Sequence, residues 1–167
     1  MVIVEGIDGV GKSTFVDNLK PYGYVKYHFT YDNKNMDLFI KYRNVLSKSN
    51  NNTKIALDRS FISEMVYGPV IRGHCRLSDK EFIELLRLYN SYSFKLFYLY
   101  ATKECLLKRR IVDQKDYEIL MQYYDELFVQ YNKVISFCKN YIETFIFNTE
   151  IKNLEEMNVE AKRILIK

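Results

Sequence analysis

Near its N-terminus the chain reads Gly6-Ile7-Asp8-Gly9-Val10-Gly11-Lys12-Ser13-Thr14, directly after the apolar run Val2 to Val4. This stretch matches the pattern G-x-x-x-x-G-K-[ST], in which a glycine-rich turn joins a strand to a helix. The residues that follow, Phe15, Val16 and Leu19, have the spacing of one helical face. Strand, turn and helix therefore occur in the order that a phosphate-binding loop requires.

The chemistry of such a loop explains why it needs these residue types. Glycines allow successive backbone N–H groups to converge on phosphate oxygens, and the N-terminus of the next helix adds a favourable dipole. We expect Lys12 to reach the β- and γ-phosphates of ATP, and the hydroxyl of Ser13 to bind Mg²⁺. The remaining expected ATP-binding residues are Gly6, Gly9, Val10, Gly11 and, in a secondary role, Thr14.

Two other interpretations of the loop stay open. The match could arise by chance in a glycine turn. Alternatively, the chain could bind a nucleoside triphosphate as an interaction switch, with slow hydrolysis, no acceptor and a partner whose binding depends on the nucleotide.

Further apolar runs alternate with helical patterns along the chain. The runs are Tyr24 to Phe29, Ile55 to Leu57, Phe94 to Tyr100 and Tyr141 to Phe147. Ser78 and Glu81 form a capping box before one helix, Asn153 with Glu156 starts the last helix, and Tyr117 to Cys138 has the pattern of a long amphipathic helix packed on the core. This alternation predicts a parallel sheet covered by helices.

Length and composition restrict the kind of protein. The 167 residues, 48% of them hydrophobic, suit one domain with one core. Three widely spaced cysteines and two histidines favour neither a disulfide framework nor a zinc cluster, so we expect a reducing, cytoplasmic location. No apolar run is long enough for a membrane span, and the N-terminus reads as a strand instead of a signal peptide.

A polar pair ends the run from Ile55 to Leu57. Asp58 and Arg59 would emerge at the carboxyl edge of the sheet, where ligands of such folds bind. Asp58 could then hold the waters of Mg²⁺ or accept the proton of the attacking group, and Arg59 could span the donor and acceptor phosphates. The alternative is an ordinary surface ion pair at the end of a strand.

Three segments match the motifs of one enzyme family. Glu5 to Thr14 is similar to E-G-x-D-x-x-G-K-[ST]-T, Asp58 to Tyr67 to D-R-Y-x-x-S-x-x-A-[YF], and Leu38 to Arg43 to L-F-x-x-x-R. The first two-thirds of the chain thus resemble the thymidylate kinase family, with the wider deoxynucleoside kinases behind it. The resemblance implies an α/β, three-layer P-loop NTPase fold with a five-stranded parallel sheet in the order 2-3-1-4-5. Residues 1–167 would form a single kinase domain.

The same resemblance implies an acceptor site. Asp8 would accept a hydrogen bond from the 3′-hydroxyl of the acceptor. Phe39 would stack on the acceptor base and Arg43 would hydrogen-bond to it, although Phe39 also suits plain helix packing. Ser63 and Tyr67 would line the same pocket, with Tyr67 against the deoxyribose.

The resemblance also implies catalytic cations. Arg59 would bridge the two phosphate groups, and a short lid near residues 108–116 would close over ATP with Arg109 and Arg110. The loop at Asn148 and Thr149 would lie beside adenine. A basic run such as Lys108-Arg109-Arg110 is otherwise typical of a solvated helix end.

Two departures leave the acceptor open. His28 to Asp32 stands where the family has R-E-P-G, and Asp58-Arg59-Ser60 resembles the Glu-Arg-Ser of deoxynucleoside kinases. We therefore predict an enzyme that uses ATP and Mg²⁺ to phosphorylate a nucleoside monophosphate, dTMP or a related deoxynucleotide. A deoxynucleoside kinase and a kinase of a polynucleotide hydroxyl are the alternatives, the latter not favoured by a net charge of only +4. A homodimer is possible. The richness in Asn, Lys, Ile and Tyr is typical of an AT-rich genome, such as that of a phage.

Overall fold

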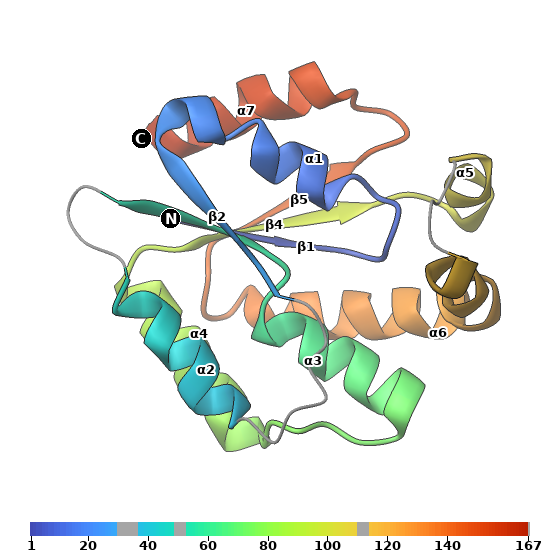
Figure 1. The fold of residues 1–167 in the computed structure, drawn as a ribbon, viewed down its shortest axis with the longest axis horizontal. Helices are drawn as coiled ribbons and strands as arrows, with labels where there is room; N and C mark the ends of the chain where they lie inside the picture. The colour runs from blue at the N-terminus through green and yellow to red at the C-terminus, as the bar shows by residue number, and fades with distance from the viewer. Residues whose placement is uncertain (30–36, 49–52, 110–113, 167) are drawn as a thin grey trace.

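A three-layer sandwich of helices around a parallel sheet forms the molecule (Figure 1). The computed structural model describes residues 1–29, 37–48, 53–109 and 114–166. The strands are β1 (Val2–Glu5), β2 (Tyr24–His28), β3 (Lys54–Asp58), β4 (Lys95–Tyr100) and β5 (Thr144–Asn148). They lie in the order β2-β3-β1-β4-β5 and all neighbours are parallel. The predicted fold class and strand order are confirmed.

Helices cover both faces of this sheet (Figure 1). One face carries α1 (Lys12–Asp17) and α7 (Leu154–Ile166). The other carries α2 (Leu38–Leu46), α3 (Phe61–Tyr67), α4 (Asp79–Ser91) and α6 (Gln114–Cys138). The shorter elements are η1 (Lys20–Tyr22), η2 (Gly68–Arg72) and α5 (Lys103–Lys108). No helix among the described residues is both long and apolar enough to cross a membrane.

The predicted helix starts are made by reciprocal caps. Ser78 Oγ accepts from Glu81 N, and Glu81 Oε2 accepts from Ser78 N at 2.8 Å. At α7, Asn153 N donates to Glu156 Oε2 at 2.8 Å and Glu156 N donates to Asn153 Oδ1 at 3.0 Å. Each pair satisfies two backbone N–H groups that have no partner within the helix, so both predictions are confirmed.

The apolar run from Tyr141 to Phe147 is only partly a strand. Backbone N–H groups of Tyr141 and Ile142 both donate to Cys138 O at 2.9 Å, which closes a turn after α6. Ile142 is buried by packing on the core, and β5 begins at Thr144. The apolar run is therefore longer than the strand that it predicted, because burial of a turn residue gives the same apolar signal as a strand.

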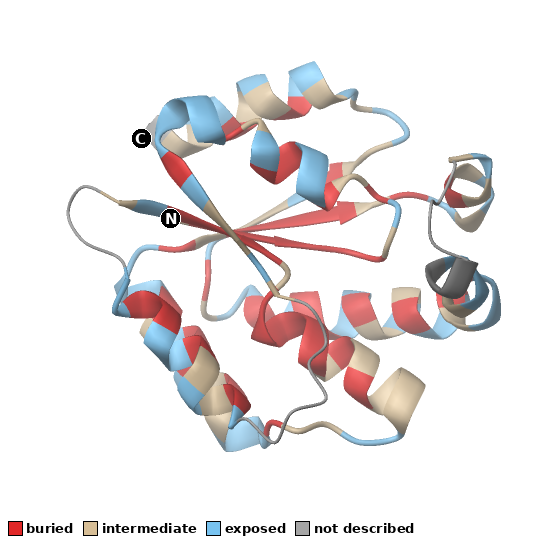
Figure 2. Cartoon of the chain, in the orientation of Figure 1, coloured by how far each residue is buried: buried red, intermediate tan, exposed pale blue. Residues whose placement is uncertain are grey.

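The centre of the sheet is completely buried, as the red strands of Figure 2 show. Val2, Ile3 and Val4 of β1 have no exposed surface, and neither does Asp58 at the end of β3. The register pairs Val4 with Asp58 and His28 with Asp58. The carboxyl ends of β1, β2 and β3 therefore meet at one edge, and their polar residues meet there too.

Candidate active site

The turn between β1 and α1 has the backbone geometry of a phosphate loop. Gly9 and Gly11 have φ angles of 84° and 91°, in the left-handed region that glycine adopts without strain. A Cβ atom at Gly6 would collide with the backbone carbonyl of Leu99. Val10 packs its side chain into the core, so only its backbone is available to a phosphate. The glycine spacing is thus a requirement of the backbone itself.

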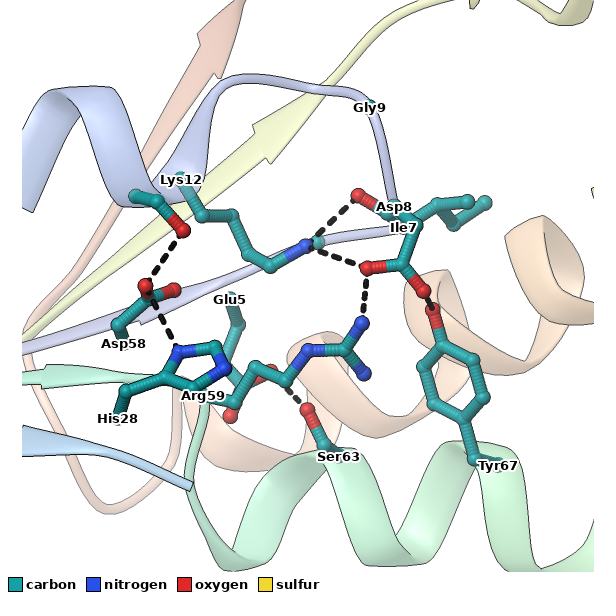
Figure 3. Close-up of polar contacts among 12 residues, drawn as sticks. Glu5, Ile7, Asp8, Gly9, Lys12, His28, Asp58, Arg59, Ser63 and Tyr67 are labelled. Carbon is teal, nitrogen blue, oxygen red and sulfur yellow. Dashed lines mark hydrogen bonds and ion pairs between the residues drawn. The ribbon is translucent and has the colours of Figure 1, made fainter. Parts of the chain in front are cut away.

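Lys12 reaches back across this loop from the first residue of α1 (Figure 3). Its Nζ donates to Ile7 O at 2.9 Å and lies 3.5 Å from Asp8 Oδ1. Burial lowers the pKa of Lys12, and the charge of Asp8 opposes that effect. The side-chain nitrogen is therefore held against the loop by Ile7 O and Asp8.

Asp8 contacts side chains from α1, from the turn after β3 and from α3. We call Asp8, Lys12, Arg59 and Tyr67 the Asp8 cluster. Arg59 Nη2 donates to Asp8 Oδ1, and the Tyr67 hydroxyl donates to Oδ2 at 3.2 Å. The Arg59 guanidinium also lies over the Tyr67 ring, 5.1 Å from its centroid. Burial alone would raise the pKa of Asp8, but Lys12 and Arg59 outweigh it and hold that pKa well below its usual range. Lys12, predicted to bind ATP, and Tyr67, predicted to bind the acceptor, thus both contact the carboxylate of Asp8.

The backbone at Arg59 explains how its side chain reaches Asp8. Its φ angle is 70°, in the left-handed region, which is uncommon for a residue other than glycine. Arg59 N donates to Val4 O at 3.1 Å, and Ser60 then caps α3 by accepting from Ile62 N. The chain therefore leaves β3 by a sharp turn that aims Arg59 at the loop. Backbone strain of this kind clusters at functional sites.

A buried carboxylate beneath Arg59 has a role that the motifs did not indicate. Glu5 Oε1 accepts from Ser60 N and Ser60 Oγ, both at 2.7 Å. Its Oε2 accepts from Ser63 Oγ at 2.6 Å and from the Tyr131 hydroxyl at 3.2 Å. Burial raises the pKa of Glu5, while these hydrogen bonds oppose the rise. We call Glu5, Ser60, Ser63 and Tyr131 the Glu5 network. Ser63 was predicted to line the acceptor pocket, but its hydroxyl donates to Glu5.

Asp58 and Ser13 form the part of the site that suits a metal. Ser13 Oγ donates to Asp58 Oδ2 at 2.6 Å, while the buried Oδ1 has no hydrogen-bond partner among the described residues. Burial alone would raise the pKa of Asp58, but the hydrogen bond from Ser13 and the proximity of His28 and Lys12 outweigh it and lower that pKa. Mg²⁺ prefers oxygen ligands and is commonly held by one or two carboxylates together with phosphate oxygens and water. Asp58 and Ser13 therefore fit Mg²⁺ that arrives with a nucleotide.

The described side chains alone do not make a metal site here. The described residues contain no group of three or more His, Cys, Asp or Glu side chains that could hold an ion. A nucleotide would have to complete the coordination.

Two basic side chains of β2 lie against the same carboxylate. Lys26 Nζ is 3.2 Å from Asp58 Oδ2, and His28 Nδ1 is 2.9 Å from that oxygen. Lys26 also lies 3.3 Å from Asp17 Oδ2 and donates to Ser13 O at 3.4 Å. Sequence reasoning singled out only His28. The available signal for Lys26 was its position two residues before His28, which puts both side chains on one side of the strand.

Arg109 joins the phosphate loop to the loop after β5. Its Nη1 donates to Gly9 O at 3.2 Å and to Thr149 Oγ1 at 3.0 Å, and its Nη2 donates to Thr149 O at 2.7 Å. Arg109 is the C-cap of α5, directly after Lys108. Arg110, the other predicted lid cation, lies outside the described residues, as do positions 111–113.

The predicted base-binding pair lies on α2. Phe39 is half-buried and packs against the core, and Arg43 is exposed one turn further along. The buried ring of Tyr42 lies between them in sequence, 4.9 Å from the Phe29 ring. Within the part of the chain that the structure describes, no hydrogen bond or ion pair joins Arg43 to the Asp8 cluster. The described hydrogen bonds and ion pairs thus do not connect Arg43 to the Asp8 cluster, and a base-binding role of Phe39 and Arg43 stays a prediction.

No family model and no curated protein matches this chain. Solved structures do match. The YorR protein of Bacillus subtilis, in complex with phosphorylated GDP, has a TM-score of 0.74 at 21% identity, over 98% of this chain and 94% of that one. The deoxyadenosine kinase of M. mycoides with bound dATP has a TM-score of 0.70 at 16% identity, over 99% of both chains. The thymidylate kinase of Candida albicans has a TM-score of 0.65 at 15% identity, over 98% of this chain and 89% of that one.

This chain has the fold of the P-loop nucleotide kinases. In a P-loop kinase fold the loop after β1 and the end of β3 lie side by side because β1 and β3 are neighbours. That is where Lys12, Ser13, Asp58 and Arg59 meet here. The likeness is one of fold, at 15–21% sequence identity.

Proposed function

We propose that the chain is an ATP- and Mg²⁺-dependent phosphotransferase that acts on a nucleoside monophosphate, dTMP or a related deoxynucleotide. The observation that supports this most strongly is the Asp8 cluster. A phosphate-loop lysine and a strand-end arginine converge on one carboxylate that is also bonded to Tyr67. Two cations at a single point suit a reaction in which negative charge passes from one phosphate to another.

Each residue of the Asp8 cluster then has a defined task. Lys12 would turn from Ile7 O to the β- and γ-phosphates, and Arg59 would contact the phosphates of donor and acceptor with its fork of N–H donors. Asp8, kept ionised by these cations, would accept a hydrogen bond from the 3′-hydroxyl of the acceptor. Tyr67 would pack against the deoxyribose. The work of the protein is positioning and charge neutralisation.

The donor side would be completed by the loop and by Arg109. Backbone N–H groups between Gly9 and Thr14 would hold the phosphates, and Ser13 with Asp58 would hold Mg²⁺. When bound, Mg²⁺ would offset the charge of the β- and γ-phosphate oxygens. Arg109, with Arg110 beside it in sequence, would cover ATP from the side of Thr149. On the acceptor side, Phe39 and Arg43 would bind the base, and Ser63 would support the pocket wall through Glu5.

A deoxynucleoside kinase is the second candidate, and one observation favours it. Asp58 Oδ1 is buried and has no hydrogen-bond partner in the described ranges, so a carboxylate oxygen is available to take a proton from a 5′-hydroxyl. The Asp58-Arg59-Ser60 sequence and the similarity to a deoxyadenosine kinase agree with this alternative. The two candidates share the phosphate loop and differ in the acceptor and in the task of Asp58.

ADP release separates them. Purified protein with ATP and Mg²⁺ is assayed against deoxynucleosides, nucleoside monophosphates, short oligonucleotides with a free 5′-hydroxyl, and no acceptor, with Lys12→Ala as the control. Stimulation by dTMP or a related monophosphate supports the proposal. Stimulation only by nucleosides or oligonucleotides identifies the corresponding alternative, and ATP binding without stimulation by any acceptor would favour a nucleotide-dependent switch.

A further inference from the structure

Lys26 lies between two carboxylates at the edge of the site. Its Nζ is 3.2 Å from Asp58 Oδ2 and 3.3 Å from Asp17 Oδ2, and it donates to Ser13 O at 3.4 Å. The side chain is only 20% exposed, so these contacts are partly shielded from water. One ammonium therefore links the edge strand β2, helix α1 and the end of β3.

The two oxygens of Asp58 differ sharply as a result. Oδ2 accepts from Ser13 Oγ and also faces Lys26 and His28, whereas the described residues give Oδ1 no hydrogen-bond partner. A cation held against one oxygen reduces the negative charge that the whole carboxylate presents to a second cation. The carboxylate that suits Mg²⁺ is thus already shared with an ammonium of the chain itself.

We propose that Lys26 weakens the attraction of this site for Mg²⁺, so that the metal binds tightly only together with a nucleotide. The inference rests on the proposed function, because it assigns Mg²⁺ to Asp58 and Ser13. Lys26 is a positioning residue that sets the charge beside Asp58, not a catalytic one. Phosphate oxygens would supply negative charge that the protein side of the site lacks, so the metal binds together with the nucleotide while Lys26 still lowers its affinity.

Asp17 would modulate this effect of Lys26. Its Oδ2 contacts Lys26, and its Oδ1 pairs with the exposed Lys20 Nζ at 2.8 Å. Replacing Asp17 by Asn removes one of the two carboxylates that share Lys26, and leaves Asp58 as its remaining acidic partner among the described residues. The effect on Mg²⁺ should therefore be opposite in sign to the loss of Lys26.

Lys20 provides a matched control. It carries the same charge and pairs with the same Asp17, but it has no contact with Asp58. Its side chain is 58% exposed, and an ion pair in that setting has little effect on its surroundings.

Calorimetric titration of ATP, with Mg²⁺ and with EDTA, tests the proposal without any acceptor. The quantity compared is the ratio of the two dissociation constants, metal-free over metal-loaded. Lys26→Met should raise this ratio roughly three- to tenfold, as expected for one unit charge near a metal in a partly solvated site. Lys26→Arg should restore the wild-type ratio, Asp17→Asn should lower it, and Lys20→Met should leave it within about twofold.

The outcomes separate this inference from the proposed function. Thermal unfolding first verifies that each variant is folded. A ratio that stays constant in Lys26→Met, or that falls because Lys26 is needed to hold Asp58 in place, would overturn the inference while ATP binding survives. Wild-type protein that binds no ATP would overturn the proposed function, and this inference with it.

Discussion

Two carboxylates, three residues apart, illustrate two different uses of negative charge. Glu5 is fully buried, and its donors among the described residues are neutral, namely a backbone N–H and three hydroxyls. Asp8 keeps 22% of its side-chain surface exposed and is paired with two cations. Burial raises the pKa of the first, and the cations lower the pKa of the second. The Glu5 network joins β1, α3 and α6 through hydrogen bonds. In the Asp8 cluster, an anionic substrate could replace Asp8 as the partner of Lys12 and Arg59.

Removal of Lys12 should produce the largest effect on the Asp8 side. We expect Lys12→Ala to lower the rate of phosphoryl transfer by about 10²–10³-fold or more, because a preorganised cation at the transferred phosphate is lost. The variant should still unfold cooperatively, since Arg59 remains paired with Asp8. Steady-state rates and urea unfolding measure the two quantities, with the exposed Lys20→Ala as the control. A Lys12→Ala protein with wild-type turnover would refute the mechanism.

On the Glu5 side the corresponding change should act mainly on stability. Glu5→Ala leaves Ser60 N and Ser63 Oγ without their buried acceptor, which should lower the free energy of unfolding by about 3 kcal/mol. Tyr131 retains Gly6 O as a partner at 3.1 Å, which limits the loss. Glu5→Gln keeps one oxygen and should cost about 1 kcal/mol. Equal stability of Glu5→Ala and wild type in urea unfolding would remove the distinction between the two regions.

The two carboxylates should also respond to pH with opposite signs. The folded-state pKa of Asp8 lies below its unfolded value of about 3.9, so its stabilising effect is present above that pH and is lost as the pH falls. The folded-state pKa of Glu5 lies above its unfolded value of about 4.3. Its contribution is therefore largest below that pH and is lost as the pH rises through the folded-state pKa.

Unfolding free energies of wild type, Asp8→Asn and Glu5→Gln between pH 3 and 8 test these signs. The difference between wild type and Asp8→Asn should grow with increasing pH, and that between wild type and Glu5→Gln should shrink. Neither slope can exceed about 1.4 kcal/mol per pH unit, the limit for one proton. Parallel slopes would mean that the two groups do not differ as the structure indicates.

The smallest effect should come from the hydroxyl of Tyr67. Tyr67→Phe loses one hydrogen bond to Asp8 Oδ2 but keeps the ring beneath Arg59, so the KM of the acceptor should rise about fivefold. The KM of ATP should not change. Tyr92→Phe, at the exposed end of α4, is the control. An effect on ATP instead of the acceptor would move Tyr67 to the donor side.

Much of the site was predictable because its signals are local. The glycine spacing of residues 6–11 identified the phosphate loop, and the end of an apolar run identified Asp58 and Arg59 as edge residues. The roles of Glu5 and Lys26 were not predictable in the same way. A glutamate in a strand and a lysine in an edge strand look ordinary until their partners are known.

By itself the sequence determined the strand-loop-helix start, the helix caps and the alternation that gives a parallel sheet, since each depends on residues only a few positions apart. Tertiary structure alone decided that Ser13 meets Asp58 across 45 positions and that Glu5 meets Tyr131 across 126. Such contacts depend on strand register and helix packing, which result from burial of the whole core. Local periodicity specifies which face of an element is buried, and the assembled core specifies what that face touches.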